Sequence, residues 1–205
     1  KTAVNHAAGK NLIGAFHQPR CVLADTSVLK SLGPREFQAG LAETLKYGII
    51  SDPTFFAWLE ASANALMKRD DETLCEAIRR SCEIKADVVA QDETETGIRA
   101  ILNFGHTFGH AIEALTNYRT YLHGEAVAIG MALDCVYARD MGFMKDADCD
   151  RILRLLERLG FALWNNDLLQ EDEEGKLVVI EGLEEFREHL GGRLTITLLR
   201  NIGEG

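Results

Sequence analysis

The chain has 205 residues, which suits one domain of generous size, and 46% of them are hydrophobic, enough to bury a core. Its 32 acidic residues outnumber 22 basic ones, and the net charge of -10 repels the phosphates of nucleic acids. The longest apolar stretches, such as residues 126–133, are too short to span a membrane. We therefore expect neither a nucleic-acid partner nor a membrane partner.

The first element that the sequence predicts is a short strand at residues 21–25, an apolar run after Pro19. From residue 34 onward, apolar residues recur with helical spacing and predict helices at residues 35–50, 53–67, 70–90, 105–115, 123–141 and 146–159. Gly142 and Gly160 stand where C-terminal caps are expected. Residues 176–180 and 193–199 predict two strands, with a helix at 183–190 between them. The predicted fold is mainly α, with short strands at both ends.

Five cysteines are present, and none of them forms a C-x-x-C pair. Cys75 and Cys82 lie seven residues apart in a predicted helix, and we expect both to be buried thiols. Unpaired thiols fit a reducing compartment, so a cytoplasmic location is expected. The sequence opens at Lys1 without an initiator methionine, and we expect it to be part of a longer chain.

Residues 98–130 carry the most informative pattern, because three of the six histidines fall there beside glycines. His106 and His110 are four residues apart and would share one face of a helix, while His123 would come from a second element. A single histidine is more often a hydrogen-bonded core residue. Three histidines flanked by small residues favour a metal site instead, with His106 and His110 as a chelating pair.

A candidate third ligand lies upstream, in the run GLAETLKYG at residues 40–48. Glu43 and Lys46 are three residues apart on one face of an apolar helix, where a carboxylate costs free energy unless a cation pairs with it. Glu43 therefore either forms an ion pair with Lys46 or completes a site of two histidines and one carboxylate. Several cations in this acidic chain suggest a substrate that carries phosphate or carboxylate: Lys10, Lys46, Lys85 and Arg99.

Six ordered blocks of the sequence resemble the 3-dehydroquinate synthases, the cyclases of the shikimate pathway. The blocks are KTAVNH at residues 1–6, GKNLIGAF at 9–16, GLAETLKYG at 40–48, ETGIR at 95–99, LNFGHTFGH at 102–110 and LHGEAV at 122–127. The similarity runs through residues 1–140. It implies aromatic amino acid biosynthesis, in which 3-deoxy-D-arabino-heptulosonate 7-phosphate, a small phosphorylated sugar acid, becomes 3-dehydroquinate and phosphate. Oxidation, phosphate elimination, reduction and aldol cyclisation would follow one another, with NAD and Zn²⁺ or Co²⁺ as cofactors.

The resemblance also implies a homodimer with an N-terminal Rossmann-like NAD domain and a C-terminal helical domain. Residues 1–30 would be the remnant of the NAD domain, and residues 31–205 the helical metal- and substrate-binding domain. We expect the Rossmann-like domain itself to be absent from this chain. The chain alone is therefore expected to hold NAD poorly and to be inactive.

Matching motifs carry the family's site residues onto this sequence. The implied metal ligands are Glu43, His106 and His123, a set that replaces the chelating pair and assigns His110 to substrate contact and proton management. The implied catalytic and substrate-binding residues are Lys46, Lys85, Arg99, Asn103 and His110, with Asn11 also binding substrate. The implied NAD contacts are Lys1, Lys10, Val28, Leu29, Lys30 and Ser31.

The C-terminal tail departs from the family pattern, because a Lys-Lys pair expected before the last glycine and strand is missing. The tail is more similar to sugar-phosphate cyclases of secondary metabolism, and Arg187 or His189 would take the place of the lysine. One alternative is therefore a cyclase that acts on sedoheptulose 7-phosphate. A second is a helical domain that binds metal without catalysis, and a weaker third is a metal-dependent alcohol dehydrogenase.

Overall fold

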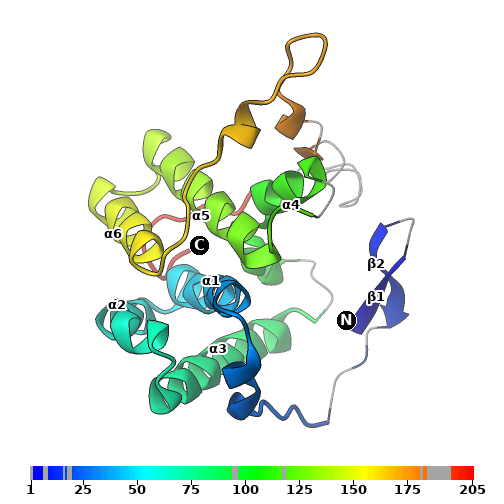
Figure 1. Cartoon of the computed structure of the whole chain (residues 1–205). Coiled ribbons are helices and arrows are strands. Elements are labelled where there is room, and N and C mark those ends of the chain that lie inside the picture. Colours follow the sequence, from blue (N-terminus) through cyan, green and yellow to red (C-terminus); the bar gives the residue numbers. More distant parts are fainter. Residues whose placement is uncertain are drawn as a thin grey trace.

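The computed structural model describes residues 2–6, 9–15, 17, 20–93, 97–116, 119–180, 182–183 and 195–205. Six α-helices make up most of the described chain (Figure 1): α1 Pro34–Ser51, α2 Pro53–Met67, α3 Asp71–Gln91, α4 His106–Leu115, α5 His123–Asp140 and α6 Asp146–Arg158. Three short 3₁₀ helices are η1 Thr26–Ser31, η2 Ile98–Asn103 and η3 Asn166–Leu169. The mainly α fold predicted from the sequence is confirmed. No helix among the described residues is long and apolar enough to cross a membrane.

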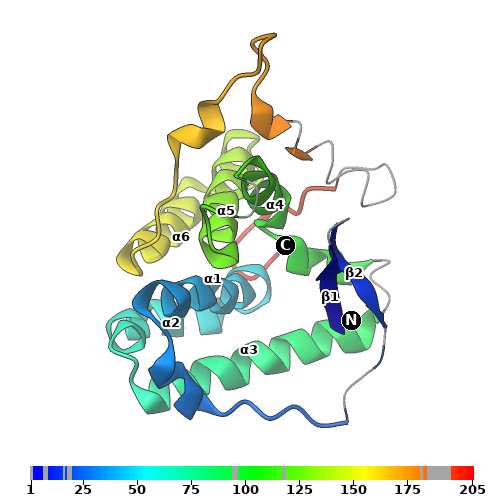
Figure 2. The ribbon, with the colours of Figure 1, turned by 45° about the vertical axis from the view of Figure 1, so that its right-hand side comes forward.

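A two-stranded antiparallel hairpin lies at the N-terminal end, formed by β1 Thr2–His6 and β2 Gly9–Ala15. Thr2 pairs with Ala15, and the register shifts between Val4 and His6. The hairpin stands to one side of the helices in Figure 1 and is drawn in front of the end of α3 in Figure 2. The buried core side chains that the structure describes come from residues outside the hairpin.

Local capping explains where the helices begin and end. The Asp52 carboxylate accepts hydrogen bonds from the backbone of Thr54 and Phe55 at 2.9 Å each, and Pro53 occupies the first turn of α2. Asp70 caps α3 in the same way. Gly142 and Gly160 follow α5 and α6 with φ of 75° and 83°, as the sequence predicted. The predicted helix bounds agree with the observed ones to within one or two residues.

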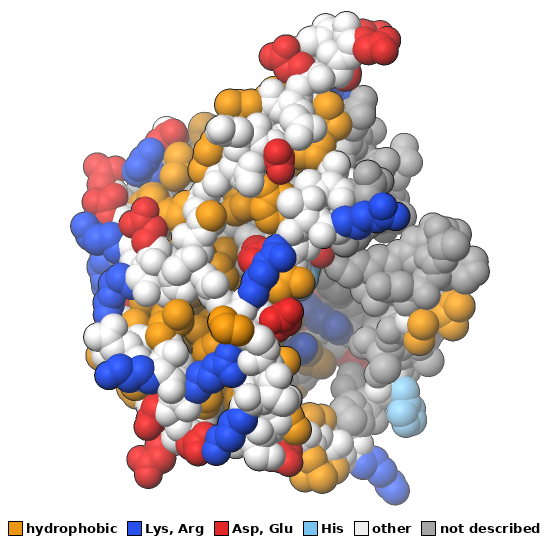
Figure 3. All heavy atoms as spheres, viewed as in Figure 1, with side chains coloured by type: hydrophobic (Ala, Val, Ile, Leu, Met, Phe, Trp, Pro, Cys, Tyr) orange, Lys and Arg blue, Asp and Glu red, His pale blue; other side chains and the backbone are white. Residues whose placement is uncertain are grey.

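The core lies where α1 and α5 cross, and α2, α3, α4 and α6 pack around them (Figures 1 and 2). Its largest fully buried side chains include Leu45, Ile49, Phe55, Phe56 and Met131. At the start of the two central helices, Arg35 of α1 bonds both carboxylate oxygens of Glu125 on α5, at 2.6 and 2.7 Å. On the face drawn in Figure 3, acidic and basic side chains are interspersed over the helices.

Two glycines let the central helices approach to backbone contact. A β-carbon at Gly124 would come within 1.9 Å of the Ala39 carbonyl oxygen, so α5 touches α1 there. A β-carbon at Gly130 would come equally close to the Gly105 carbonyl oxygen, at 1.9 Å, so α5 also touches the start of α4. These two contacts set the spacing of α1, α4 and α5.

The predicted strand positions are wrong where the structure describes them. Residues 21–25 form no strand and are exposed, Leu177 makes a single bridge to Glu171, and residues 178–180 turn helically. Residues 195–199 form no strand either, but Leu199 is fully buried and Leu198 packs against the core. The apolar pattern there reflects burial against helices. A strand would also need a neighbouring backbone to form hydrogen bonds with. Most of the helix predicted at residues 183–190 lies outside the described residues.

The cysteine prediction is also wrong, because Cys75 and Cys82 are exposed. They lie on the outer face of α3, whose inner face is set by other positions: Leu74, Ala77, Ser81 and Val88. Cys135 and Cys149 are the buried thiols among the described residues.

Candidate metal centre

Three helices each deliver one potential ligand to the same point. Glu43 lies in the middle of α1, while His106 and His123 are the first residues of α4 and α5. Glu43 Oε1 is 3.3 Å from His106 Nε2 and 3.6 Å from His123 Nε2. One ligand atom from each of the three lies within 4.8 Å of the others, a spacing that can hold one metal ion.

The partners of the other ring nitrogens define which nitrogen of each histidine carries hydrogen. His106 Nδ1 is 3.1 Å from the Phe104 carbonyl oxygen, and His123 Nδ1 is 3.2 Å from Glu113 Oε2. The Phe104 carbonyl can only accept, so His106 Nδ1 donates to it, and an ionised Glu113 carboxylate likewise accepts from His123 Nδ1. In each neutral ring the lone pair is then on Nε2 and faces Glu43.

The oxygen at the centre of this arrangement has no hydrogen-bond donor among the described residues. Glu43 Oε1 is buried and unpartnered, whereas Oε2 accepts a 2.7 Å bond from Lys46 Nζ. Burial lowers the pKa of His106, so its ring is neutral near pH 7 and cannot donate from Nε2. Burial would raise the pKa of Glu43, but the neighbouring charge of Lys46 opposes this effect, and the pKa of Glu43 lies well below its usual range. An anionic oxygen and two imidazole lone pairs facing one another fit a divalent cation.

His110 does not join this set. Its ring lies edge-on to that of His106, with centroids 5.6 Å apart, and its Nδ1 is 2.9 Å from Glu113 Oε2. Glu113 Oε2 therefore accepts from both His110 and His123. His110, Glu113 and His123 are also close enough to hold a metal ion, but the nitrogens that face Glu113 carry hydrogens and offer no lone pair.

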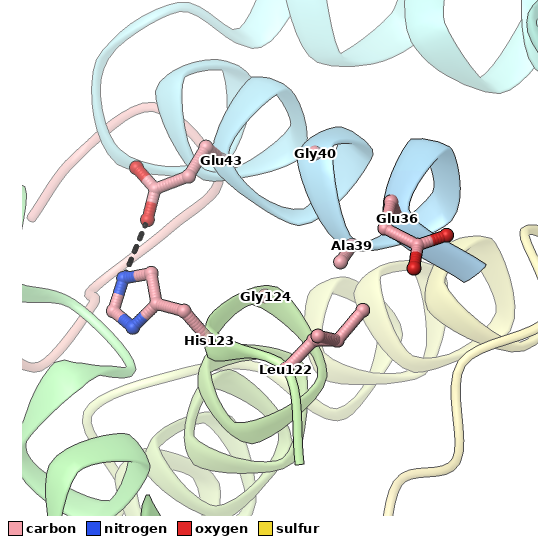
Figure 4. A pocket seen from close by; sticks show the side chains of 7 residues that line it. All are labelled: Glu36, Ala39, Gly40, Glu43, Leu122, His123 and Gly124. Atoms are coloured by element: carbon pink, nitrogen blue, oxygen red, sulfur yellow. Dashed lines mark ion pairs between the residues drawn. The ribbon is translucent and has the colours of Figure 1, made fainter. Parts of the chain in front are cut away.

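An open pocket of about 290 Å³ lies beside the centre, between the first half of α1 and the start of α5. Figure 4 shows Glu43 and His123 facing each other at one end of it, with Glu36 and Leu122 further out. The pocket gives a small molecule access to the Glu43 side of the centre.

Of the predicted cations, Lys46 contacts the centre directly, through Glu43 Oε2. Lys46 is buried, and its pKa is lowered by burial, against the opposing effect of Glu43. Lys85 is exposed on α3, yet its charge also lowers the pKa of Lys46, so the two lie within electrostatic reach. Arg99 donates to the Glu93 carbonyl at 2.6 Å, and Asn103 ends η2 just before Phe104.

The predicted NAD contacts that the structure describes, at residues 28–31, lie on η1 rather than at this centre. Lys30 forms an ion pair with Asp71 at 3.0 Å, and the Leu29 carbonyl accepts from Arg69, so η1 packs at the start of α3. Lys1 lies outside the described residues, as do the side chains of Lys10 and Asn11. The tail residues Arg187 and His189 are outside them as well.

Two buried carboxylates near the centre were not assigned a role from the sequence. Glu113 is 4% exposed and lies three residues after His110, a spacing that signals a shared helix face. Asp134 is 1% exposed and interrupts the apolar run of α5. The sequence does carry one signal for Glu113 and Asp134, because each is an acidic residue inside an otherwise apolar helix.

Asp134 leads to a prediction about stability and pH. Burial raises its pKa to about 7, against the lowering effect of a hydrogen bond from the Gly105 backbone. The folded carboxyl therefore holds a proton that the unfolded one, with a pKa of about 4, releases. Proton binding by Asp134 therefore contributes to the free energy of unfolding at low pH, and this contribution is lost as the pH rises through 7. Between pH 5 and pH 8, urea denaturation of the metal-free chain should show a loss on the order of 2 kcal/mol.

The matched variant for this measurement is Asp134→Asn, which cannot titrate. Its free energy of unfolding should vary less between pH 5 and pH 8 than that of the wild type. Parallel pH profiles for the two proteins would show that Asp134 does not titrate in this range.

The fold and the site together define a helical domain built around a candidate divalent-metal centre of two histidines and one glutamate. The chain belongs to the 3-dehydroquinate synthase family. The model of the family's C-terminal part matches residues 40–177, and the model of its N-terminal part matches residues 1–39. The two matches meet inside α1.

Individual relatives agree with this assignment. The chain is 52% identical over 204 residues to a 3-dehydroquinate synthase from Methylococcus capsulatus, a match that covers 100% of this chain and 55% of that protein. It is 49% identical over 204 residues to a 3-dehydroquinate synthase from Halorhodospira halophila, covering 100% of this chain and 56% of the relative. The chain thus spans about half the length of the curated relatives it matches.

Two solved structures are similar over nearly the whole chain. A 2-epi-5-epi-valiolone synthase from Streptomyces hygroscopicus subsp. jinggangensis, with NAD⁺ and Zn²⁺ bound, is 27% identical with a TM-score of 0.85. That match covers 99% of this chain and 55% of the other. A 2-deoxy-scyllo-inosose synthase complexed with carbaglucose-6-phosphate, NAD⁺ and Co²⁺ is 30% identical, with a TM-score of 0.79 over 98% of this chain and 55% of that one.

Proposed function

We propose that this chain is the metal- and substrate-binding part of a 3-dehydroquinate synthase. The protein that contains it would convert 3-deoxy-D-arabino-heptulosonate 7-phosphate to 3-dehydroquinate and phosphate, as a carbon–oxygen lyase that uses NAD. The observation that carries the proposal is the buried, unpartnered Glu43 Oε1 opposite the Nε2 atoms of His106 and His123. It occurs in a chain about half identical to proteins of that name.

The proposed metal ligands are Glu43, His106 and His123. Zn²⁺ and Co²⁺ are the candidate ions, since each is bound in one of the two similar structures. When bound, a divalent cation would act as a Lewis acid toward a substrate oxygen. The chain's part is to hold the two rings by their Nδ1 atoms, so that both Nε2 atoms stay directed at Glu43.

The same proposal assigns substrate binding to a set of basic and polar residues. Lys46, Lys85 and Arg99 would neutralise the phosphate and carboxylate of the substrate, and Asn103 would hydrogen-bond its hydroxyls. His110, whose Nδ1 lies 2.9 Å from Glu113 Oε2, would exchange a proton with the substrate. Contacts to phosphate or NAD would come from the N-terminal segment: Lys1, Lys10, Asn11, Val28, Leu29, Lys30 and Ser31.

The whole-protein features belong to the same proposal. We assign residues 1–30 to the NAD-binding part and residues 31–205 to the metal- and substrate-binding domain. The complete enzyme would be a cytoplasmic homodimer, and residues 1–205 alone, which span about half the length of the relatives, would be inactive.

A second candidate is a cyclase that acts on sedoheptulose 7-phosphate. The similarity to the valiolone synthase structure, with a TM-score of 0.85, favours it, as does the departure of residues 184–199 from the usual pattern. Identity of 52% and 49% to 3-dehydroquinate synthases, against 27% to the valiolone synthase, makes it the second choice.

The test is phosphate release by the protein that carries this chain together with whatever residues precede it in its gene. With NAD⁺ and Zn²⁺ present, 3-deoxy-D-arabino-heptulosonate 7-phosphate should be consumed and phosphate released. Release from sedoheptulose 7-phosphate alone would establish the second candidate. Zn²⁺ binding with no release from either substrate would leave a non-catalytic metal-binding domain.

A further inference from the structure

Asp134 occupies an unusual position behind the metal centre. Its side chain projects from the middle of α5 and is 1% exposed. Oδ2 accepts a 2.8 Å hydrogen bond from the Gly105 N–H, and Oδ1 is buried without a hydrogen-bond partner among the described residues. A buried carboxylate costs free energy, so its position at this backbone group calls for an explanation.

The Gly105 N–H and the Phe104 carbonyl belong to one peptide group. Its N–H end donates to Asp134, and its carbonyl end accepts from His106 Nδ1 at 3.1 Å. Asp134, this peptide and the His106 ring therefore form one line that ends at Nε2, which faces Glu43 Oε1. Hydrogen bonds in series polarise one another, so the Asp134 oxygen that accepts at the N–H end makes the carbonyl a stronger acceptor.

The packing around Gly105 holds this peptide in place. Gly105 has φ of 76°, a conformation that favours glycine, and a β-carbon there would lie 2.5 Å from Met131 Cγ. Phe104 is fully buried. If the Phe104–Gly105 peptide rotated away from Asp134, its N–H would be buried without a hydrogen-bond partner. The hydrogen bond to Asp134 therefore disfavours that rotation.

We propose that Asp134 is a positioning residue for His106, acting through the Phe104–Gly105 peptide to fix the tautomer and orientation of the ring. The inference rests on the proposed metal site. Glu113 orients the His123 ring by direct contact, with 3.2 Å between Glu113 Oε2 and His123 Nδ1. Groups that orient metal ligands typically change metal affinity by about 10- to 100-fold when removed.

The experiment compares Asp134→Ala, which removes the acceptor, with Asp134→Asn, which keeps an oxygen for the Gly105 N–H. Zn²⁺ affinity is measured by competition with a chromophoric chelator, and the His106 tautomer by ¹⁵N NMR of the metal-free chain. Asp134→Ala should weaken Zn²⁺ binding about 10-fold or more and lower the fraction of Nδ1–H tautomer. Asp134→Asn should recover most of both.

A core variant separates positioning from stability. Leu156→Ala, in the buried face of α6, should lower Tm as Asp134→Ala does, without changing Zn²⁺ affinity or the tautomer. If Asp134→Ala binds Zn²⁺ as tightly as the wild type with an unchanged tautomer, the inference is overturned while the metal site stands. If the wild type binds no Zn²⁺, the metal site and the inference fall together.

Discussion

Replacing Glu43 or His123 by alanine is expected to abolish stoichiometric Zn²⁺ binding, whereas His110→Ala is expected largely to spare it. Glu43 supplies the anionic oxygen and His123 one of the two lone pairs directed at it. His110 instead turns its Nδ1 toward Glu113. Two remaining ligands from a set of three cannot hold Zn²⁺ with the affinity of the complete set.

Isothermal titration with Zn²⁺, with circular dichroism as the test of folding, measures this difference. Glu43→Gln is the matched control for shape, because it keeps the size of the side chain and removes the charge; it should also lose the ion. Equal loss in Glu43→Ala, His123→Ala and His110→Ala would contradict the assignment and restore the pair of His106 and His110 as ligands.

The second large effect is expected at Gly124, where alanine should destabilise the chain by about 3 kcal/mol. The added β-carbon would meet the Ala39 carbonyl oxygen at 1.9 Å, and backbone cannot move aside as a flexible side chain can. Separating α1 from α5 would also draw Glu43 away from His123, so Zn²⁺ affinity should fall with stability.

Gly40→Ala is the control, since Gly40 lies on α1 next to Ala39 and a β-carbon added there would meet nothing within 4 Å. Alanine is a better helix former than glycine, so this variant should gain up to about 1 kcal/mol. Urea denaturation of both variants gives the comparison. Equal stability of Gly124→Ala and Gly40→Ala would show that α1 and α5 do not cross as closely as described.

The helices could be predicted because their signals are local. Asp52 and Asp70 cap the helices that follow them, and Gly142 and Gly160 end two others, so the bounds could be placed within one or two residues. The set of metal ligands could not be predicted from local signals alone. Spacing alone favoured His106 with His110, and the family motifs were needed to replace His110 by His123.

The strands, the cysteines and the buried carboxylates behind the site depend on tertiary contacts. Apolar residues near Leu199 pack against helices. In the sequence, the alternation of apolar and polar residues there looks the same as that of a strand. Asp134 meets Gly105 across 29 positions of sequence, because Gly130 lets α5 approach the start of α4. Only the folded arrangement reveals that one peptide links Asp134 to His106.

Crystals of the chain soaked in Zn²⁺ and measured at the zinc absorption edge test the central claim most directly, because anomalous scattering locates the ion. One strong peak is expected, bounded by Glu43 Oε1, His106 Nε2 and His123 Nε2. A peak between His106 and His110, or among His110, Glu113 and His123, would contradict it.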